Sequence, residues 1–203
     1  MKKIFSLIAA MLLALPVTSA QTTSMVIDRA IEALTAAGGI TATYTLAGDN
    51  GTISGRVAMR GNCFAMLADE AKCWFDGKTQ WAYSAATGEV NITEPTAAEL
   101  QLTNPIATLR AAKTEFIVTR GDARQPGIVT LRLTPKQRTN VRNVQLSFDN
   151  KTSLPVSAVI MTADGQAATL TISNLKTGQR LPASAFSFDK QMVPPGTPVV
   201  DLR

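Results

Sequence analysis

The chain holds few residues whose types and spacing could support catalysis. It contains no histidine, so the side chain that most often transfers protons near neutral pH is missing, and nucleophilic systems built on a histidine base are excluded. The closest acidic pair, Asp69-Glu70, falls in a predicted exposed turn, and no glycine-rich loop leads into a helix as a phosphate site requires. A carboxylate pair assembled only by folding is the remaining catalytic alternative. We therefore expect a protein that is not an enzyme and that holds no metal and no cofactor.

The two cysteines, Cys63 and Cys73, could form a disulfide. They flank a turn-like Ala68-Asp69-Glu70, so they could face each other across a hairpin, and an oxidising compartment would allow them to bond. Cysteines on neighbouring strands do not always bond, because a disulfide has a specific geometry. The pattern favours a disulfide, with two free thiols as the alternative.

Large aromatic side chains gather in one short segment, WFDGKTQWAY at residues 74–83. The segment is typical of two strands around a tight turn, with Asp76-Gly77 supplying the positive backbone dihedrals of a narrow hairpin. Trp74 and Phe75 must point to opposite faces of their strand, so the aromatic residues cannot all line one cavity. We expect some of them to hold the hairpin to the body of the sheet.

The N-terminus has the organisation of an export signal. Two lysines precede an apolar run over residues 4–16, and small residues indicate cleavage after Ala20. The run is shorter than the ~20 residues of a membrane-spanning helix, and Gln21 is not a cysteine that could accept a lipid. We expect residues 1–20 to be removed and residues 21–203 to form one soluble, exported and monomeric domain.

The charge of the chain argues against nucleic acid as a partner. The formal net charge is +5, and the basic residues are spread along the sequence. A nucleic-acid groove would require clustered lysine and arginine.

Alternation of apolar and polar residues with a period of two dominates the rest of the chain. In residues 143–149, for example, Val144, Leu146 and Phe148 share one face. We expect about eleven strands separated by turn signals, over residues 41–47, 52–59, 63–67, 72–75, 79–84, 114–119, 127–134, 143–149, 154–162, 166–174 and 184–188. Many short strands in succession predict a mainly β fold, an antiparallel barrel or strongly curved sheet.

Helical signals occur in two places. Apolar residues at helical spacing predict an amphipathic helix over residues 24–37. The sequence Thr96-Ala97-Ala98-Glu99 has the form of a capping box that opens a short helix, and Asn104-Pro105 opens another. These helices are expected over one side or mouth of the curved sheet, where their apolar faces meet its inner face. The proline-rich residues 192–203 form either an extended arm along the body or a loosely held end.

Several motifs together resemble one known family. The run WFDGKTQWAYSAATGEVNITEP at residues 74–95 is similar to the W-x-DG-K-T-x-W-x-Y segment of the periplasmic lipoprotein carrier LolA. Residues 163–171 resemble the family's D/N-G-Q strand, and residues 186–188 resemble its closing F-x-F strand. The likeness extends over nearly the whole chain after the export signal. The sequence NITEPTAAEL and the C-terminal residues 201–203 look like the divergent LolA-like proteins of Bacteroidetes.

The resemblance implies an unclosed antiparallel barrel with a lid of short helices, the fold shared by LolA, LolB and RseB. It also implies a periplasmic chaperone that carries lipoproteins to the outer membrane. Such a carrier receives acylated lipoproteins from an inner-membrane ABC release transporter, shields their acyl chains in an apolar cavity and delivers them to an outer-membrane acceptor.

One residue role follows from the resemblance. Arg60 in MRGNCF occupies the place of the arginine in the family's R-P-N-x-F motif, which implies that it holds the lid closed through bonds to lid backbone. Alternation places Arg60 opposite Val57 and Met59, so either a bulge re-aims it or those two residues do not face the cavity. A solvated surface arginine is the alternative.

Apolar alternation gives the candidates for the acyl-chain cavity, and sequence alone does not separate a cavity from a packed core. The candidates are Ile27, Ile31, Leu34, Leu131, Leu133, Val144, Leu146, Phe148, Leu170 and Ile172. Two functional alternatives share the predicted architecture. One is a periplasmic lipid or lipopeptide sensor of the RseB type, and the other is an interaction protein with a filled core.

Overall fold

The structure of the chain, a computed structural model, describes residues 19–49, 51–122 and 125–203. Residues 1–18 of the expected export signal lie outside the described residues, and Ser19 and Ala20 begin the first helix.

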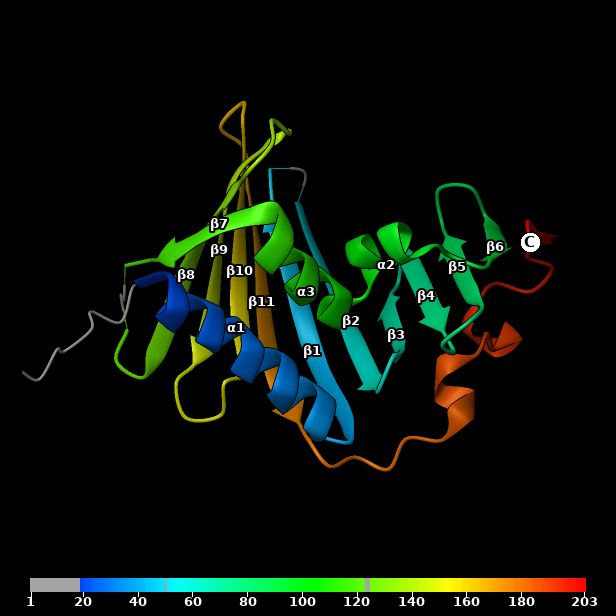
Figure 1. The fold of residues 1–203 in the computed structure, drawn as a ribbon. Helices are drawn as coiled ribbons and strands as arrows, with labels where there is room; N and C mark the ends of the chain where they lie inside the picture. Colours follow the sequence, from blue (N-terminus) through cyan, green and yellow to red (C-terminus); the bar gives the residue numbers. More distant parts are fainter. Residues whose placement is uncertain (1–18, 50, 123–124) are drawn as a thin grey trace, which may run out of the picture.

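The described residues form one sheet of twelve strands, in the order β12-β6-β5-β4-β3-β2-β1-β11-β10-β9-β8-β7. The strands are β1 Gly39–Gly48, β2 Gly51–Arg60, β3 Cys63–Ala68, β4 Ala71–Phe75, β5 Gln80–Ser84, β6 Glu89–Thr93, β7 Phe116–Arg120, β8 Ile128–Pro135, β9 Val141–Asp149, β10 Pro155–Thr162, β11 Ala167–Lys176 and β12 Val199–Asp201. All neighbouring strands are antiparallel except β12, which runs parallel to β6. Because β7 and β12 lie at opposite edges, the sheet is curved but unclosed (Figure 1), and the predicted mainly β, open-barrel class is confirmed.

Two details of the strand prediction were wrong. Strands β6 and β12 were not expected, and the strand expected at residues 184–188 is instead the 3-10 helix η1, Ala183–Phe186. Pro182 caps this turn, and a proline has no N–H to give to a sheet ladder. The C-terminal residues are therefore an extended arm that ends as a strand of the sheet.

In the described part of the chain, three α-helices lie against one face of the sheet, which we call the helix face (Figure 1). They are α1 Ser19–Ala36, α2 Ala97–Thr103 and α3 Pro105–Glu115. The capping box expected before α2 is present, because Thr96 accepts from the Glu99 backbone and the Glu99 carboxylate accepts from the Thr96 backbone. The predicted helices are confirmed in type and position.

The core under these helices is apolar and closely packed. Ile27, Ala30 and Leu34 of α1, which occur at helical spacing, are all buried, and so are Ile106 and Leu109 of α3. Their strand partners include Phe64 and Phe75 on one side and Leu131, Leu133 and Phe148 on the other. Burial of each such side chain stabilises the fold by about 1.5–3 kcal/mol.

The opposite face of the sheet carries a second core, and the chain's own C-terminal segment covers it. We call residues 177–198 the strap and this face the strap face. Figure 1 shows the strap leaving β11, passing beneath the sheet and reaching β6. Phe186 of the strap is buried against Trp74, Tyr83 and Val90, and Phe188 meets Trp74 edge-on with ring centroids 5.6 Å apart.

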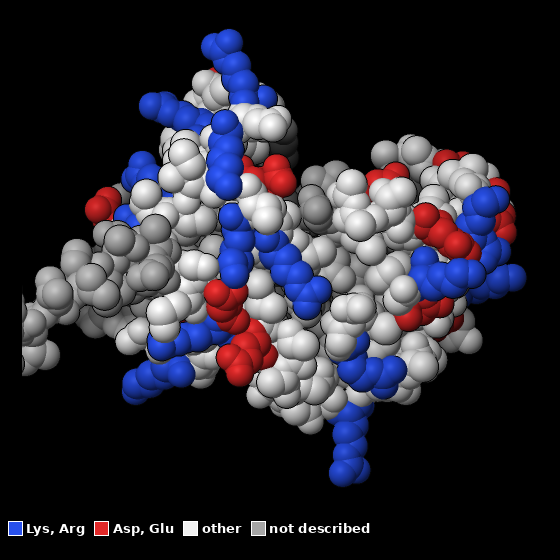
Figure 2. All heavy atoms as spheres, in the orientation of Figure 1, with Lys and Arg blue, Asp and Glu red and all other residues white. Residues whose placement is uncertain are grey.

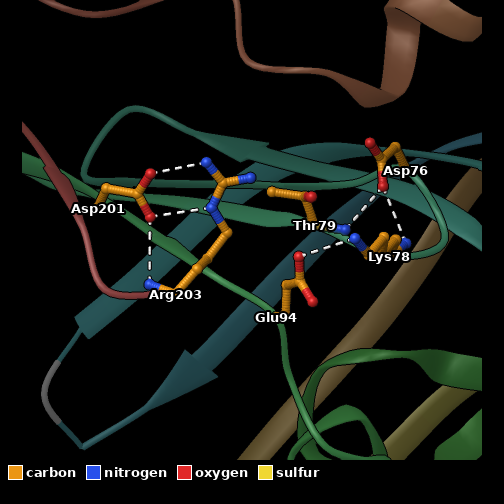
Figure 3. Close-up of polar contacts among 6 residues, drawn as sticks. All are labelled: Asp76, Lys78, Thr79, Glu94, Asp201 and Arg203. Atoms are coloured by element: carbon orange, nitrogen blue, oxygen red, sulfur yellow. Dashed lines mark hydrogen bonds and ion pairs between the residues drawn. The ribbon is translucent and has the colours of Figure 1, made fainter.

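The aromatic hairpin is the part of the sheet that the strap covers. Its turn is closed by Asp76, whose carboxylate accepts from the backbone N–H groups of Lys78 at 2.9 Å and Thr79 at 2.8 Å (Figure 3). Within this turn only Gly77 has a positive φ, of 105°. Trp74 is paired directly with Trp81 on the strap face, whereas Phe75 packs on the helix face. The tryptophans therefore hold hairpin and strap together.

Candidate functional site

Most of the expected cavity residues lie together under the helices. Five of them are buried in the helix-face core and three more pack half-buried against it. They are Ile27, Leu34, Leu131, Leu133 and Phe148, followed by Ile31, Val144 and Leu146. In this structure these side chains contact one another, so the helices themselves fill the place where a ligand was expected.

Beyond the helices, the same face of the sheet continues as an uncovered apolar surface, which we call the trough. Leu46 is paired with Ile53 on one side and with Leu170 on the other, and directly paired residues share a face. The pairing extends through β10 and β11, so the trough consists of Tyr44, Leu46, Ile53, Ala158, Ile160, Ala168, Leu170 and Ile172. Figure 1 shows the corresponding ends of β1, β2, β10 and β11 extending past α1 and α3. The expected residues Leu170 and Ile172 thus lie in the trough.

A hollow of about 290 Å³ occupies the outer end of the trough. Its floor is formed by Leu46, Ile53, Ile160 and Ala168, and its rim by Gly48, Asp49, Gly51, Thr162, Gln166 and Ala167. Ile53 is 41% exposed, which is unusual for a large apolar residue on an inner face. The hollow therefore offers apolar contact inside and hydrogen-bonding groups at its entrance, the combination typical of sites for amphipathic ligands.

Arg60 lies on the strap face and not under the helices. The pairing of β1 with β2 is regular up to Arg60, so no bulge re-aims it, and Met59 beside it faces the helices. The guanidinium donates to the carbonyl of Leu181 and lies over the ring of Phe186, 5.3 Å from its centroid. Its partners in the structure are thus strap residues, whereas the resemblance implied lid backbone.

The two cysteines do not form the disulfide that the sequence favoured, because both thiols are free. Cys63 packs on the strap face and donates to the carbonyl of Asp76 at 3.0 Å, whereas Cys73 packs in the helix-face core opposite Met66. Side chains on opposite faces of a sheet cannot be bridged. Burial raises the pKa of Cys73 to about 12, and burial also raises the pKa of Cys63, partly offset by the Arg60 charge.

Charged side chains lie over the exposed side of the helices and at the far edge of the sheet. Figure 2 shows Lys and Arg along a column over α3 and the adjoining strand tips, with acidic side chains close by. Lys113 of α3 pairs with Asp28 of α1, which links the two helices across their exposed side. At the far edge of the sheet, Lys78 pairs with Glu94 and Arg203 with Asp201 (Figure 3).

Two findings limit the chemistry within residues 19–49, 51–122 and 125–203. No group of three or more His, Cys, Asp or Glu side chains is placed to hold a metal ion. No helix of this part of the chain is both long enough and apolar enough to cross a membrane.

Sequence reasoning missed two residues that organise the site. Asn104 connects α2 and α3 and also contacts the turn between β2 and β3. The pair Asn104-Pro105 predicted the start of a helix, but nothing in the sequence indicated that Asn104 would contact Asn62. Tyr44 was read only as part of a strand, because its place at the inner end of the trough depends on the register of three strands.

The described residues thus form an open antiparallel sheet whose inner face is partly covered by helices and partly left apolar. The chain matches the family model described as outer membrane lipoprotein carrier protein LolA over residues 14–166. It belongs to this family.

Solved structures with the same fold are similar to this chain at low identity. An uncharacterized conserved protein from Thermus thermophilus is 15% identical with a TM-score of 0.64, covering 89% of this chain and 99% of that one. The MucA/MucB complex of Pseudomonas aeruginosa contains a chain that is 15% identical with a TM-score of 0.51, where the match covers 85% of this chain and 62% of the other. A search of curated protein sequences gave no match.

Proposed function

We propose that the protein is a periplasmic chaperone that binds the acyl chains of lipoproteins and carries them from the inner to the outer membrane. The N-terminal export signal and the family support the compartment. The cargo would come from an inner-membrane ABC release transporter and pass to an outer-membrane acceptor. The domain, residues 21–203, acts as a monomer and without a cofactor.

The observation that carries this proposal is the continuity of the trough with the core under the helices. Along β1 the buried residues Ala42 and Ile40 precede Tyr44 on the same face, and Ile40 belongs to the helix-face core. Along β2 the trough residue Ile53 is followed on that face by Gly55 and Val57, and Val57 packs against the same core. An acyl chain that enters the hollow therefore meets one continuous and largely apolar surface as soon as α1 and α3 move away.

Free energy explains why such a surface suits a carrier. Each buried methylene contributes about 0.8 kcal/mol, so a lipid anchor with several chains does not leave a membrane for water unaided. In the empty protein the helices cover the same surface, and a ligand only replaces their apolar side chains with its own. Binding is then strong enough to extract the anchor and weak enough to release it.

The test incubates spheroplasts of a related host with purified residues 21–203 and identifies released material by mass spectrometry. The wild-type protein is expected to bring intact acylated lipoproteins into a soluble complex. Ile53→Asp places a charge in the trough and should abolish release. Ile117→Asp is the matched control, because Ile117 is 56% exposed on β7 and paired with Thr134 away from the helices. No release by folded wild type with an active transporter would refute the carrier function.

The alternative is a periplasmic lipid or lipopeptide sensor that regulates a protein partner, as RseB does. The fold shared with a chain of the MucA/MucB complex supports it. This alternative predicts a stable periplasmic partner in affinity purification and no extraction of lipoproteins from spheroplasts.

A further inference from the structure

Tyr44 lies at the boundary between the two parts of the inner face. On β1 it is followed by Leu46 in the trough and preceded by Ala42, which is buried. Across the sheet it is paired with Gly55 on β2 and Ile172 on β11. Along β1, the surroundings of the inward side chains therefore change from the helix-covered apolar core to Tyr44, and then to the hollow with its polar rim.

The ring of Tyr44 extends across β2, over Gly55. A Cβ atom at Gly55 would lie 2.6 Å from both Cζ and the hydroxyl oxygen of Tyr44. The same Cβ would also lie 2.6 Å from the carbonyl oxygen of Leu67. Since no positive φ calls for glycine at this position, the missing side chain leaves room for both the phenol and the backbone of β3. The hydroxyl is thereby held at the floor of the inner face and does not point out to the solvent side of the sheet.

This hydroxyl is the only hydrogen-bonding side-chain group among the residues that define the trough, whose other members are Leu, Ile and Ala. Within the described part of the chain, no residue forms a hydrogen bond with it. Burial raises the pKa of Tyr44, so the phenol stays protonated and can donate. An acceptor that a ligand brings would replace water at this half-buried donor, with a modest net gain in free energy.

We propose that the Tyr44 hydroxyl is a subsite for the carbonyl group that links an acyl chain to its polar head. The order of environments along β1 matches the order of groups in such a ligand. The hydrocarbon lies under the displaced helices, the ester or amide carbonyl accepts from Tyr44, and the head occupies the hollow beside Asp49, Thr162 and Gln166. This subsite rests on the proposed acyl-chain binding and adds recognition of the acyl linkage to it.

The test compares two soluble lipids by titration calorimetry, dioctanoyl phosphatidylcholine and its dioctyl ether analogue, which lacks the carbonyl oxygens. Wild type is expected to bind the ester about threefold to tenfold more tightly than the ether, the value of one neutral hydrogen bond. Tyr44→Phe should lose this preference while its affinity for the ether stays unchanged. Tyr83→Phe is the control, because Tyr83 lies on the strap face, opposite to the trough. This variant should keep the preference for the ester.

Three other results would refute the subsite. Equal affinity of wild type for the two lipids, or an equal loss of both affinities in a folded Tyr44→Phe, would refute the subsite and leave acyl-chain binding standing. A preference that persists in Tyr44→Phe would also refute it. If wild type binds neither lipid, the subsite fails together with the proposed function.

Discussion

The side-chain amide of Asn104 donates to the main-chain carbonyl of Asn62 at 3.2 Å, and this bond ties the junction of α2 and α3 to the turn between β2 and β3. The same side chain accepts from the backbone N–H groups of Ile106 and Ala107, at 2.9 and 3.1 Å, and so caps α3. Asn104 is buried, with 6% of its surface exposed. One residue thus begins a helix and attaches it to the sheet.

Asn104→Ala should destabilise the protein by about 1–3 kcal/mol, because it removes a helix cap and the hydrogen bond that ties the helix junction to the Asn62 carbonyl. Asn104→Asp keeps the cap and loses only the donor, so it should cost less. Urea denaturation gives the two free energies of unfolding, and hydrogen exchange should show faster opening of α2 and α3. Equal losses for the two variants would mean that the cap contributes nothing.

Arg60→Leu should loosen the strap and leave the helices in place. It removes a charged hydrogen bond to the carbonyl of Leu181 and the cation–π contact with Phe186. Together these interactions contribute about 1–3 kcal/mol to the stability of the strap. Hydrogen exchange of residues 177–193 should accelerate. Arg56→Leu, an exposed change on the same face of β2, is the control. Faster exchange in α2 and α3 instead would support the lid role that the family resemblance implied.

Gly39→Ala should also release the strap, by steric means. A Cβ atom at Gly39 would lie 2.0 Å from the carbonyl oxygen of Gln179, whose N–H donates to Gly39 at 2.9 Å. The strap must move, at a cost of about 1–3 kcal/mol. Gly48→Ala at the other end of β1 meets nothing closer than 3.5 Å and should be tolerated. Similar melting temperatures for the two variants would contradict this account.

The thiols should differ in reactivity. Because burial raises the pKa of Cys73 to about 12, almost no thiolate forms there at pH 8, and iodoacetamide should modify Cys63 first. Mass spectrometry of the folded and the denatured protein measures both rates. A disulfide-linked peptide under non-reducing conditions would contradict the structure.

The same pKa predicts a dependence of stability on pH. The neutral thiol of Cys73 is favoured in the folded state, so its contribution is complete below the unfolded pKa of 9.0 and is lost as the pH rises toward 12. Stability should therefore decline above about pH 9. Cys73→Ala should decline less steeply over that range.

Local patterns explain which elements the sequence predicted correctly. The helix at residues 24–37 was readable from apolar spacing, and α2 from its capping box, because both signals act within a few residues. Alternation found the strands that bury one face. It failed at residues 184–188, where Phe186 and Phe188 pack on the sheet from outside it, and it could not show β12, which has only three residues.

The site was less predictable because it depends on register and coverage. Alternation placed Leu131 and Leu170 on inward faces equally well, yet the first is buried under the helices and the second lies in the trough. The face to which Arg60 points followed from alternation, but its partner could not, since the strap reaches it from Leu181 far along the chain.

The pairing of β1 with β11 at the centre of the sheet has a consequence for how the chain acquires its shape. Thr43 and Ser173, which share a hydrogen bond there, are 130 positions apart in the sequence. The hairpins of the N-terminal half can form locally, but they join the rest of the sheet only after β11 has been made. Pairing of such high contact order slows folding, so this chain stays unfolded for longer than a sheet built only from local hairpins.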